Sequence, residues 1–175
     1  MDHRKKNILE LTRCTVEEYR DLRKNPLIVV ADNVRSMHNI GSIFRTADAF
    51  LVEEIVLCGI SGTPPHPEIT KTALGAEETV KWRHADDALG VVEKLRSDGW
   101  KICTLEQTHN SIPLNEFQNR NEERLVLVVG NEVSGVDQRI VDISDYVLEI
   151  PQYGTKHSLN VSVSAGIAMY QLLIK

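Results

Sequence analysis

Three polar stretches of the chain carry residue types that could bind and activate a substrate. The first, 32–48, places Asn39 and Arg45 near the start of an expected helix. Two turns of helix span about seven residues, so both side chains can face the same side. A helix start favours an anionic group, and an arginine can hold a phosphate through two parallel hydrogen bonds. Taken alone, this stretch is explained better by a surface ion pair between Arg45 and Asp48 than by a phosphate-binding site.

The second stretch, Gly130-Asn-Glu-Val-Ser-Gly135, directly follows an apolar run and contains the acidic residue Glu132. Its two glycines allow a tight turn and a close approach of the backbone to a ligand. The stretch lacks both the GK[ST] and the GxGxxG patterns, so neither a phosphate loop nor a dinucleotide fingerprint is present. On its own, a plain turn between a strand and a helix is the simpler interpretation.

The third stretch, 150–160, contains Lys156, His157, Ser158 and Asn160. Ser158 could cap the last helix of the chain, which is a purely structural role. A Ser/Asn pair at the end of a strand also suits hydrogen bonding to a polar ligand. A serine next to a histidine does not indicate a hydrolase here, because the GxSxG elbow is absent.

Apolar runs alternate with amphipathic stretches along the chain, and this alternation positions the three polar stretches. It predicts an α/β fold with a mostly parallel sheet of six to seven strands and helices on both faces. Ligands of such sheets bind outside the carboxyl ends of the strands, here the loops after Ala31, Val129 and Ile150. We expect strands at 27–31, 54–60, 79–83, 100–105, 125–129 and 146–150, and helices at 15–22, 39–50, 69–74, 86–97 and 159–173.

Length and composition indicate an ordinary globular protein. The 175 residues predict one domain with at most a short appended segment, and we divide the chain into a short N-terminal helical extension, 1–26, and one main domain, 27–175. A net charge of −5 argues against binding nucleic acid through overall charge, but it leaves room for a local basic patch. We expect no membrane segment and no signal peptide, and therefore a cytoplasmic location. The histidines form no HxH or HExxH group, so we expect no metal, and the cysteines are expected to be reduced packing residues: Cys14, Cys58 and Cys103.

Taken together and in this order, the three stretches resemble the three motifs of the SpoU/TrmH family of the SPOUT methyltransferase class. The first motif is matched by 39–49, the second by 128–135, and the third by Ile150-Pro151 followed by 158–163. The stretch 71–77 also resembles a segment that is common in this family. The similarity covers about residues 27 to 174, which is nearly the whole chain.

The resemblance implies a fold and partners that the sequence pattern alone does not give. The C-terminal third would thread into a deep trefoil knot, which makes 27–175 a SPOUT methyltransferase domain and a rare exception to unknotted topology. The cofactor would be S-adenosyl-L-methionine, and the other partners would be tRNA or rRNA and a second copy of the chain in a homodimer. The implied cofactor-binding residues are Leu105, Gly130, Ile150, Leu159 and Asn160.

The resemblance also implies a reaction, methylation of a ribose 2′-hydroxyl, and a set of catalytic residues. Arg45 matches the catalytic arginine of the family, and Asn39, Glu132, Ser158 and Asn160 match the other polar positions. An arginine rarely accepts a proton, because its pKa lies far above neutrality. We therefore expect Arg45 to assist proton removal together with an RNA phosphate, or to position the substrate and stabilise charge. The other four residues would orient the arginine, the ribose and the methyl donor.

Two other interpretations stay open at this point. The small size and the acidic charge also suit a non-catalytic RNA-binding or assembly factor that keeps the fold. A related branch of the class methylates the N1 atom of guanine, although Ser158-Leu-Asn160 favours ribose.

Overall fold

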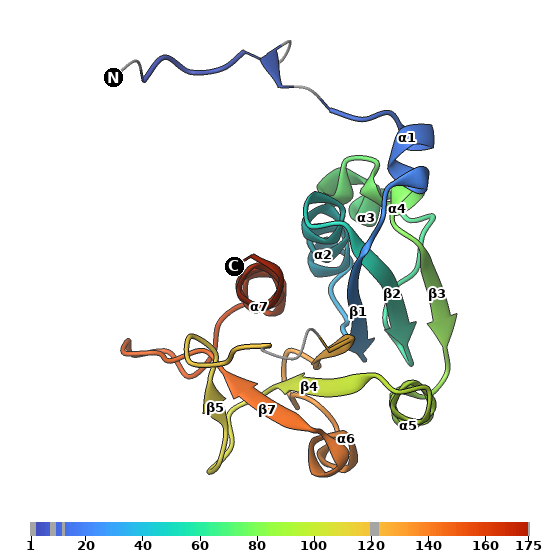
Figure 1. Cartoon of the computed structure of the whole chain (residues 1–175). Coiled ribbons are helices and arrows are strands. Elements are labelled where there is room, and N and C mark those ends of the chain that lie inside the picture. The colour runs from blue at the N-terminus through green and yellow to red at the C-terminus, as the bar shows by residue number, and fades with distance from the viewer. Residues whose placement is uncertain (1–2, 8–9, 12, 120–122, 175) are drawn as a thin grey trace.

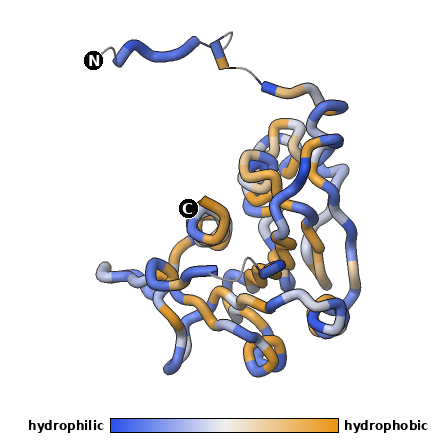
Figure 2. Tube along the Cα trace, in the orientation of Figure 1, coloured by the Kyte–Doolittle hydropathy of each residue, from blue (hydrophilic) through white to orange (hydrophobic). Residues whose placement is uncertain are grey.

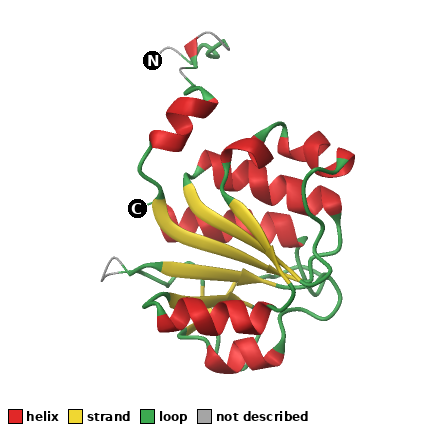
Figure 3. Cartoon of the chain, turned by 90° about the vertical axis from the view of Figure 1, so that its right-hand side faces the viewer, coloured by secondary structure: helices red, strands yellow, loops and turns green. Residues whose placement is uncertain are grey.

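A single parallel sheet of seven strands organises the chain in the computed structural model (Figures 1 and 3). The structure describes residues 3–7, 10–11, 13–119 and 123–174. The strand order is β3-β2-β1-β6-β4-β7-β5, and all neighbouring strands run parallel. The predicted α/β class is therefore confirmed. The strands are β1 (Asn25–Asp32), β2 (Val52–Cys58), β3 (Trp82–Ala85), β4 (Lys101–Leu105), β5 (Ile112–Pro113), β6 (Leu125–Val129) and β7 (Tyr146–Glu149).

Helices cover both faces of the sheet (Figure 3). One core includes side chains of α1, α2, α3, α4 and α7, whereas α5 and α6 cover the other face. Strand β1 shows why both faces need covering, because Leu27 and Val29 belong to the first core and Ile28 and Val30 to the second. The helices are α1 (Val16–Asp21), α2 (Met37–Ala49), α3 (Pro67–Ala73), α4 (Ala76–Thr79), α5 (Ala88–Ser97), α6 (Gln138–Ile143) and α7 (Val161–Leu173).

Local sequence signals explain where several of these elements begin. The capping box predicted at Thr15 and Glu18 is present at the start of α1. Thr79 ends the short helix α4, so the strand expected from residue 79 begins only at Trp82. Strand β5 and helix α6 were not expected, because elements of two and six residues are too short to show a clear periodicity.

The described residues before α1, namely 3–7, 10–11 and 13–15, extend away from the sheet in Figure 1. Helix α1 itself is attached to the main body, since the side chain of Tyr19 is buried in the core. The division of the chain after residue 26 stays a prediction, and residues 1–2, 8–9 and 12 of the extension lie outside the described residues.

The cysteines differ in their surroundings. Cys58 and Cys103 are buried, as expected of packing residues, but the same expectation is wrong for Cys14, which is exposed. Burial raises the pKa of the Cys58 thiol to about 12, so this thiol stays protonated and unreactive at neutral pH. None of the helices described is both long enough and apolar enough to cross a bilayer.

Asp145 connects the start of β4 to the start of β7 through hydrogen bonds. The loops that follow these two strands lie at their opposite, carboxyl ends. The Asp145 carboxylate accepts a hydrogen bond from the Ile102 N–H at 2.9 Å and lies 3.0 Å from the Lys101 Nζ. Burial alone would raise the pKa of Asp145, but the hydrogen bonds from Ile102 and Lys101 outweigh it and hold that pKa below its usual value. The folded state therefore favours the ionised form.

Replacing Asp145 with Asn should lower the free energy of unfolding by about 1 kcal/mol at pH 7, because the charged acceptor is lost. The carboxylate stabilises the fold fully above its unfolded pKa of about 3.9, and this contribution is lost as the pH falls through the lower pKa of the folded state. Denaturant titrations at pH 7 and below pH 4 should show the difference between the two proteins closing in acid. Asp86→Asn, at an exposed position, is the matched control, and a difference that persists at low pH would contradict this assignment.

Candidate functional site

A chain of hydrogen bonds joins the three polar stretches at the carboxyl edge of the sheet. The Asn39 Nδ2 donates to the Glu132 Oε1 at 2.9 Å, and the Asn39 Oδ1 accepts from the Asn160 Nδ2 at 3.0 Å. Asn39 is only 9% exposed, so its amide depends on these partners for hydrogen bonding. One residue from each predicted motif therefore takes part in this chain, which we call the Asn39 relay.

Glu132 also binds the backbone just before α2. Its carboxylate accepts hydrogen bonds from the N–H groups of Arg35 and Ser36, each at 3.1 Å. Partial burial pushes the pKa of Glu132 up, but the hydrogen bonds from Arg35, Asn39 and Ser36 outweigh it and the pKa lies below its usual value. Glu132 is thus an ionised group at neutral pH, next to the N-terminus of a helix, where negative charge is stabilised.

Asn160 has a second role as the cap of α7. Its Oδ1 accepts from the Ser162 N–H at 2.9 Å and from the Val163 N–H at 3.3 Å. The capping role that the sequence also allowed for Ser158 is therefore taken by Asn160. Ser158 is exposed and forms no hydrogen bond within the described part of the chain, which leaves its hydroxyl available to a ligand.

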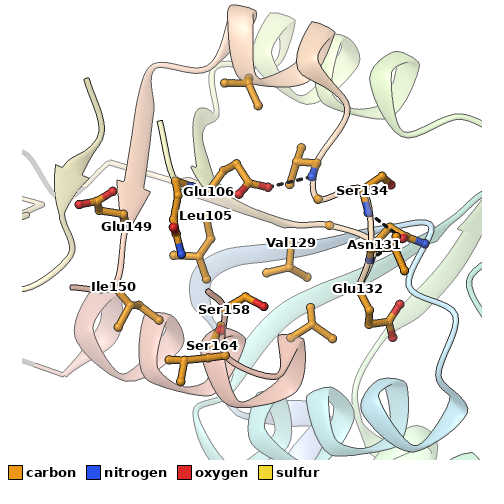
Figure 4. A pocket seen from close by; sticks show the side chains of 18 of the residues that line it. Leu105, Glu106, Val129, Asn131, Glu132, Ser134, Glu149, Ile150, Ser158 and Ser164 are labelled. Atoms are coloured by element: carbon orange, nitrogen blue, oxygen red, sulfur yellow. Dashed lines mark hydrogen bonds between the residues drawn. The ribbon is translucent and has the colours of Figure 1, made fainter. Parts of the chain in front are cut away.

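A cavity of about 650 Å³ lies beside the relay (Figure 4). Its volume is in the usual range for small-molecule sites. All five residues expected to bind the cofactor line it, together with Glu132 and Ser158; the five are Leu105, Gly130, Ile150, Leu159 and Asn160. Neither Asn39 nor Arg45 is among the lining residues.

The turn between β6 and α6 forms one wall of this cavity and requires its glycines. A Cβ at Gly130 would lie 2.2 Å from the carbonyl carbon of Gly135 and 2.3 Å from the Val136 nitrogen. Gly135 has a φ of 70°, a left-handed conformation that favours glycine. The backbones of Asn131 and Gly135 pair through hydrogen bonds of 3.0 and 3.1 Å. The glycines predicted for a tight turn thus bring two parts of the backbone into contact.

Asn131, which is not among the site residues expected from the sequence, holds this turn in place. Its Oδ1 accepts from the N–H groups of Val133 and Ser134 at 2.8 and 3.1 Å, and its Nδ2 donates to the Asn33 carbonyl at 2.8 Å. An asparagine that follows a glycine in a loop is a turn signal that could have indicated the first role. Nothing in the local sequence indicates the second, because Asn33 lies 98 residues away.

Arg45 lies apart from the relay. It is exposed on α2 and forms no hydrogen bond or ion pair with any residue that the structure describes. The surface pair with Asp48 considered above is not formed, since Asp48 instead accepts a hydrogen bond from the Thr79 hydroxyl at 2.6 Å. Six residues advance a helix by about 600°, which separates Asn39 and Arg45 by about 120° rather than placing them on one side.

Helix α7 contains many hydrophobic residues (Figure 2), and several of its apolar side chains are exposed beside α2. Val163, Ile167 and Tyr170 are 51%, 41% and 56% exposed. These three side chains line a groove together with Ser42 and Thr46 of α2. Large apolar side chains that remain exposed in a row commonly mark an interaction surface.

The cavity suits a ligand with both apolar and polar parts. Leu105, Ile150 and Leu159 provide apolar contact, whereas the turn at Gly130 and the amide of Asn160 provide hydrogen-bonding groups. Among the described residues, no group of three His, Cys, Asp or Glu side chains could hold a metal ion. The arrangement can therefore hold a mixed organic ligand and present polar side chains to a second molecule at its mouth.

The fold and the cavity define an α/β protein with a ligand site at the carboxyl edge of a parallel sheet. Residues 26–170 match the sequence profile of the SpoU rRNA Methylase family, and the chain belongs to this family. The resemblance proposed from the three motifs is confirmed.

Individual relatives agree with this assignment. A tRNA (guanosine(18)-2′-O)-methyltransferase from Aquifex aeolicus is 34% identical over 170 residues, which cover 94% of this chain and 76% of that protein. The crystal structure of the A. aeolicus TrmH/SpoU tRNA modifying enzyme superposes with a TM-score of 0.79 at 32% identity, covering 89% of this chain and 78% of that one.

A second solved structure is an AdoMet-bound rRNA methyltransferase from Sinorhizobium meliloti. It superposes with a TM-score of 0.78 at 25% identity over 87% of this chain. The chain spans only 58% of that protein, and 58 to 64% of several other curated relatives.

Replacing Gly130 with Ala should destabilise the protein by about 1–3 kcal/mol, because the added methyl group collides with backbone atoms that cannot move independently. The same variant should also bind ligands in the cavity more weakly. Gly154→Ala is the matched control, since a Cβ there meets no atom within 4 Å. Thermal unfolding of the two variants measures the difference, and equal stability would show that the turn does not need its glycine.

Proposed function

We propose that this protein transfers a methyl group from S-adenosylmethionine to a ribose 2′-hydroxyl of tRNA or rRNA. The observation that carries the proposal is the Asn39 relay, which brings the three motifs together beside a cavity of suitable size. The names of the Aquifex and Sinorhizobium relatives support both the methyl donor and the RNA substrate.

The cavity fits the proposed methyl donor. Leu105, Ile150 and Leu159 would contact the flat adenine ring, and backbone groups at Gly130 would bind polar parts. A Cβ at Gly130 would collide with the backbone of Gly135 and Val136, so this wall of the cavity requires a residue without a side chain at position 130. When bound, S-adenosylmethionine supplies a methyl group that is already activated by its sulfonium charge.

The protein side of the reaction is to orient the ribose and to assist loss of its proton. The free hydroxyl of Ser158 and the amide of Asn160 lie at the cavity and would position the ribose. The ionised Glu132 would fix Asn39, and through it Asn160, in one orientation. Arg45, which has no protein partner among the described residues, is free to bind an RNA phosphate and to stabilise the charge that develops as the proton leaves.

A homodimer would complete this site. The exposed apolar row of α7 supports it, because Val163, Ile167 and Tyr170 would become buried against a second copy. Arg45 supports it as well, since the arginine does not line the cavity of its own chain. We infer that Arg45 acts at the cavity of the partner subunit. The trefoil knot and the cytoplasmic location stay predictions.

The two alternatives differ from this proposal in measurable ways. An assembly factor without activity would bind RNA but not S-adenosylmethionine. A guanine-N1 methyltransferase would place the methyl group on a base, which mass spectrometry of digested RNA distinguishes from 2′-O-methylation.

Replacing Arg45 with Ala should reduce methyl transfer to cellular tRNA and rRNA by about a hundredfold or more, because charge stabilisation at the reacting centre is lost. Binding of S-adenosylmethionine should change little, because Arg45 does not line the cavity. Transfer of a labelled methyl group and calorimetric titration measure the two effects separately. Full transfer activity in this variant would remove Arg45 from the mechanism.

Mixing two inactive variants tests the arrangement across subunits. Arg45→Ala and Ser158→Ala each lack one residue of the proposed site. After the subunits are exchanged, mixed dimers should regain activity, because one of their two sites combines an intact Arg45 from one chain with an intact Ser158 from the other. Each variant alone, treated in the same way, is the control. Mixed dimers that stay inactive would place Arg45 and Ser158 in the site of a single chain.

A further inference from the structure

The carboxylate of Glu106, the residue after β4, is fixed in the wall of the cavity (Figure 4). Its Oε2 accepts a hydrogen bond from the Val136 N–H at 3.0 Å, and its Oε1 accepts one from the Gln107 N–H at 2.9 Å. The missing side chain of Gly135 makes room for it, because a Cβ there would lie 2.2 Å from the Glu106 Oε2. Glu106 therefore links the loop after β4 to the turn after β6.

The neighbouring Gln107 extends this link to the third polar stretch. Its Nε2 donates to the carbonyl oxygen of His157 at 2.9 Å. Three loops that surround the cavity are thus held together by the side chains of two consecutive residues. Of the three consecutive residues 105–107, the family resemblance implies a role only for Leu105.

The charged side chains that line the cavity all have the same sign. Glu132 and Glu149 join Glu106 in the lining, and no Lys, Arg or His is found among the lining residues in the described part of the chain. Glu149 is also held in place, since its Oε2 accepts a hydrogen bond from the Ser111 hydroxyl at 2.7 Å. A cleft lined by charges of one sign concentrates their field and favours ligands of the opposite sign.

We infer that this cavity distinguishes the methyl donor from its product by charge, and that Glu106 is a principal determinant of that preference. The inference rests on the proposed function. S-adenosylmethionine carries a sulfonium and has a net positive charge, whereas S-adenosylhomocysteine, the product, is a neutral thioether with no net charge. The two share every other group. A negative lining therefore stabilises the donor more than the product, which favours donor binding and product release.

The experiment compares affinities for the two ligands in the full-length protein by calorimetry. The wild type should bind S-adenosylmethionine more tightly than S-adenosylhomocysteine, and the ratio should fall as salt is added. Glu106→Gln should lower this ratio by about threefold, the effect of a partly exposed charge. Glu93→Gln, which removes an exposed carboxylate on α5 away from the cavity, should leave the ratio unchanged. Sinefungin, in which a cationic amine replaces the methylated sulfur, should behave like the donor.

The ratio separates a charge effect from a merely structural one. If Glu106 only holds the loops together, Glu106→Gln lowers the affinity for both ligands by the same factor. The ratio of the two affinities is then unchanged, and the inference is overturned. Should that variant fail to fold, Glu149→Gln provides the same test, with a fall in the ratio expected. A wild type that binds both ligands without preference also overturns the inference but leaves the proposed function standing. A wild type that binds neither ligand overturns the proposed function itself.

Discussion

The side-chain amide of Asn39 is the contact on which the candidate site depends. It donates to Glu132, 93 residues away in the sequence, and accepts from Asn160, 121 residues away. The amide carries a donor nitrogen and an acceptor oxygen on the same carbon, so an ionised aspartate, which can only accept, or a leucine of similar size could not make both bonds. Because Asn39 is buried, losing either partner would leave a polar group unsatisfied at a cost of about 1–3 kcal/mol.

The parallel sheet makes this contact possible. All seven strands run in one direction, so the loops that follow β1, β4, β6 and β7 emerge at the same edge. Helix α2 begins directly after the first of these loops, and α7 packs beside it against the same face of the sheet. Asn39 near the start of α2 and Asn160 at the start of α7 are thereby brought together. The topology of the sheet therefore brings the three motifs near one another, and the side chains of the Asn39 relay then join them through hydrogen bonds.

The parts of the fold that could be predicted from sequence are those with strong local patterns. Residues 27–31 of β1 and the whole of β6 are apolar because both faces of the sheet are covered, and the capping box of α1 is a local signal. Helix α6 is too short to show a pattern. Glu106 and Asn131 escaped notice for another reason, since their partners Val136 and Asn33 become neighbours only after folding. Both Ser158 and Asn160 suit the cap of α7, because serine and asparagine cap equally well, and only the structure shows that Asn160 takes this position.

The residues of the candidate site differ in how firmly the protein holds them, and this difference bears on mechanism. Glu132, Asn39 and Asn160 are fixed by hydrogen bonds to one another and to the starts of α2 and α7. Groups that are already in position need no reorganisation when a substrate arrives, which is how polar sites stabilise a transition state efficiently. Arg45 has no such partner among the described residues. An arginine that must hold an RNA phosphate gains from this freedom, because a strong ion pair within the protein would first have to be broken. The fixed residues would thus define where the reacting atoms lie, while the arginine completes the site only when RNA is present.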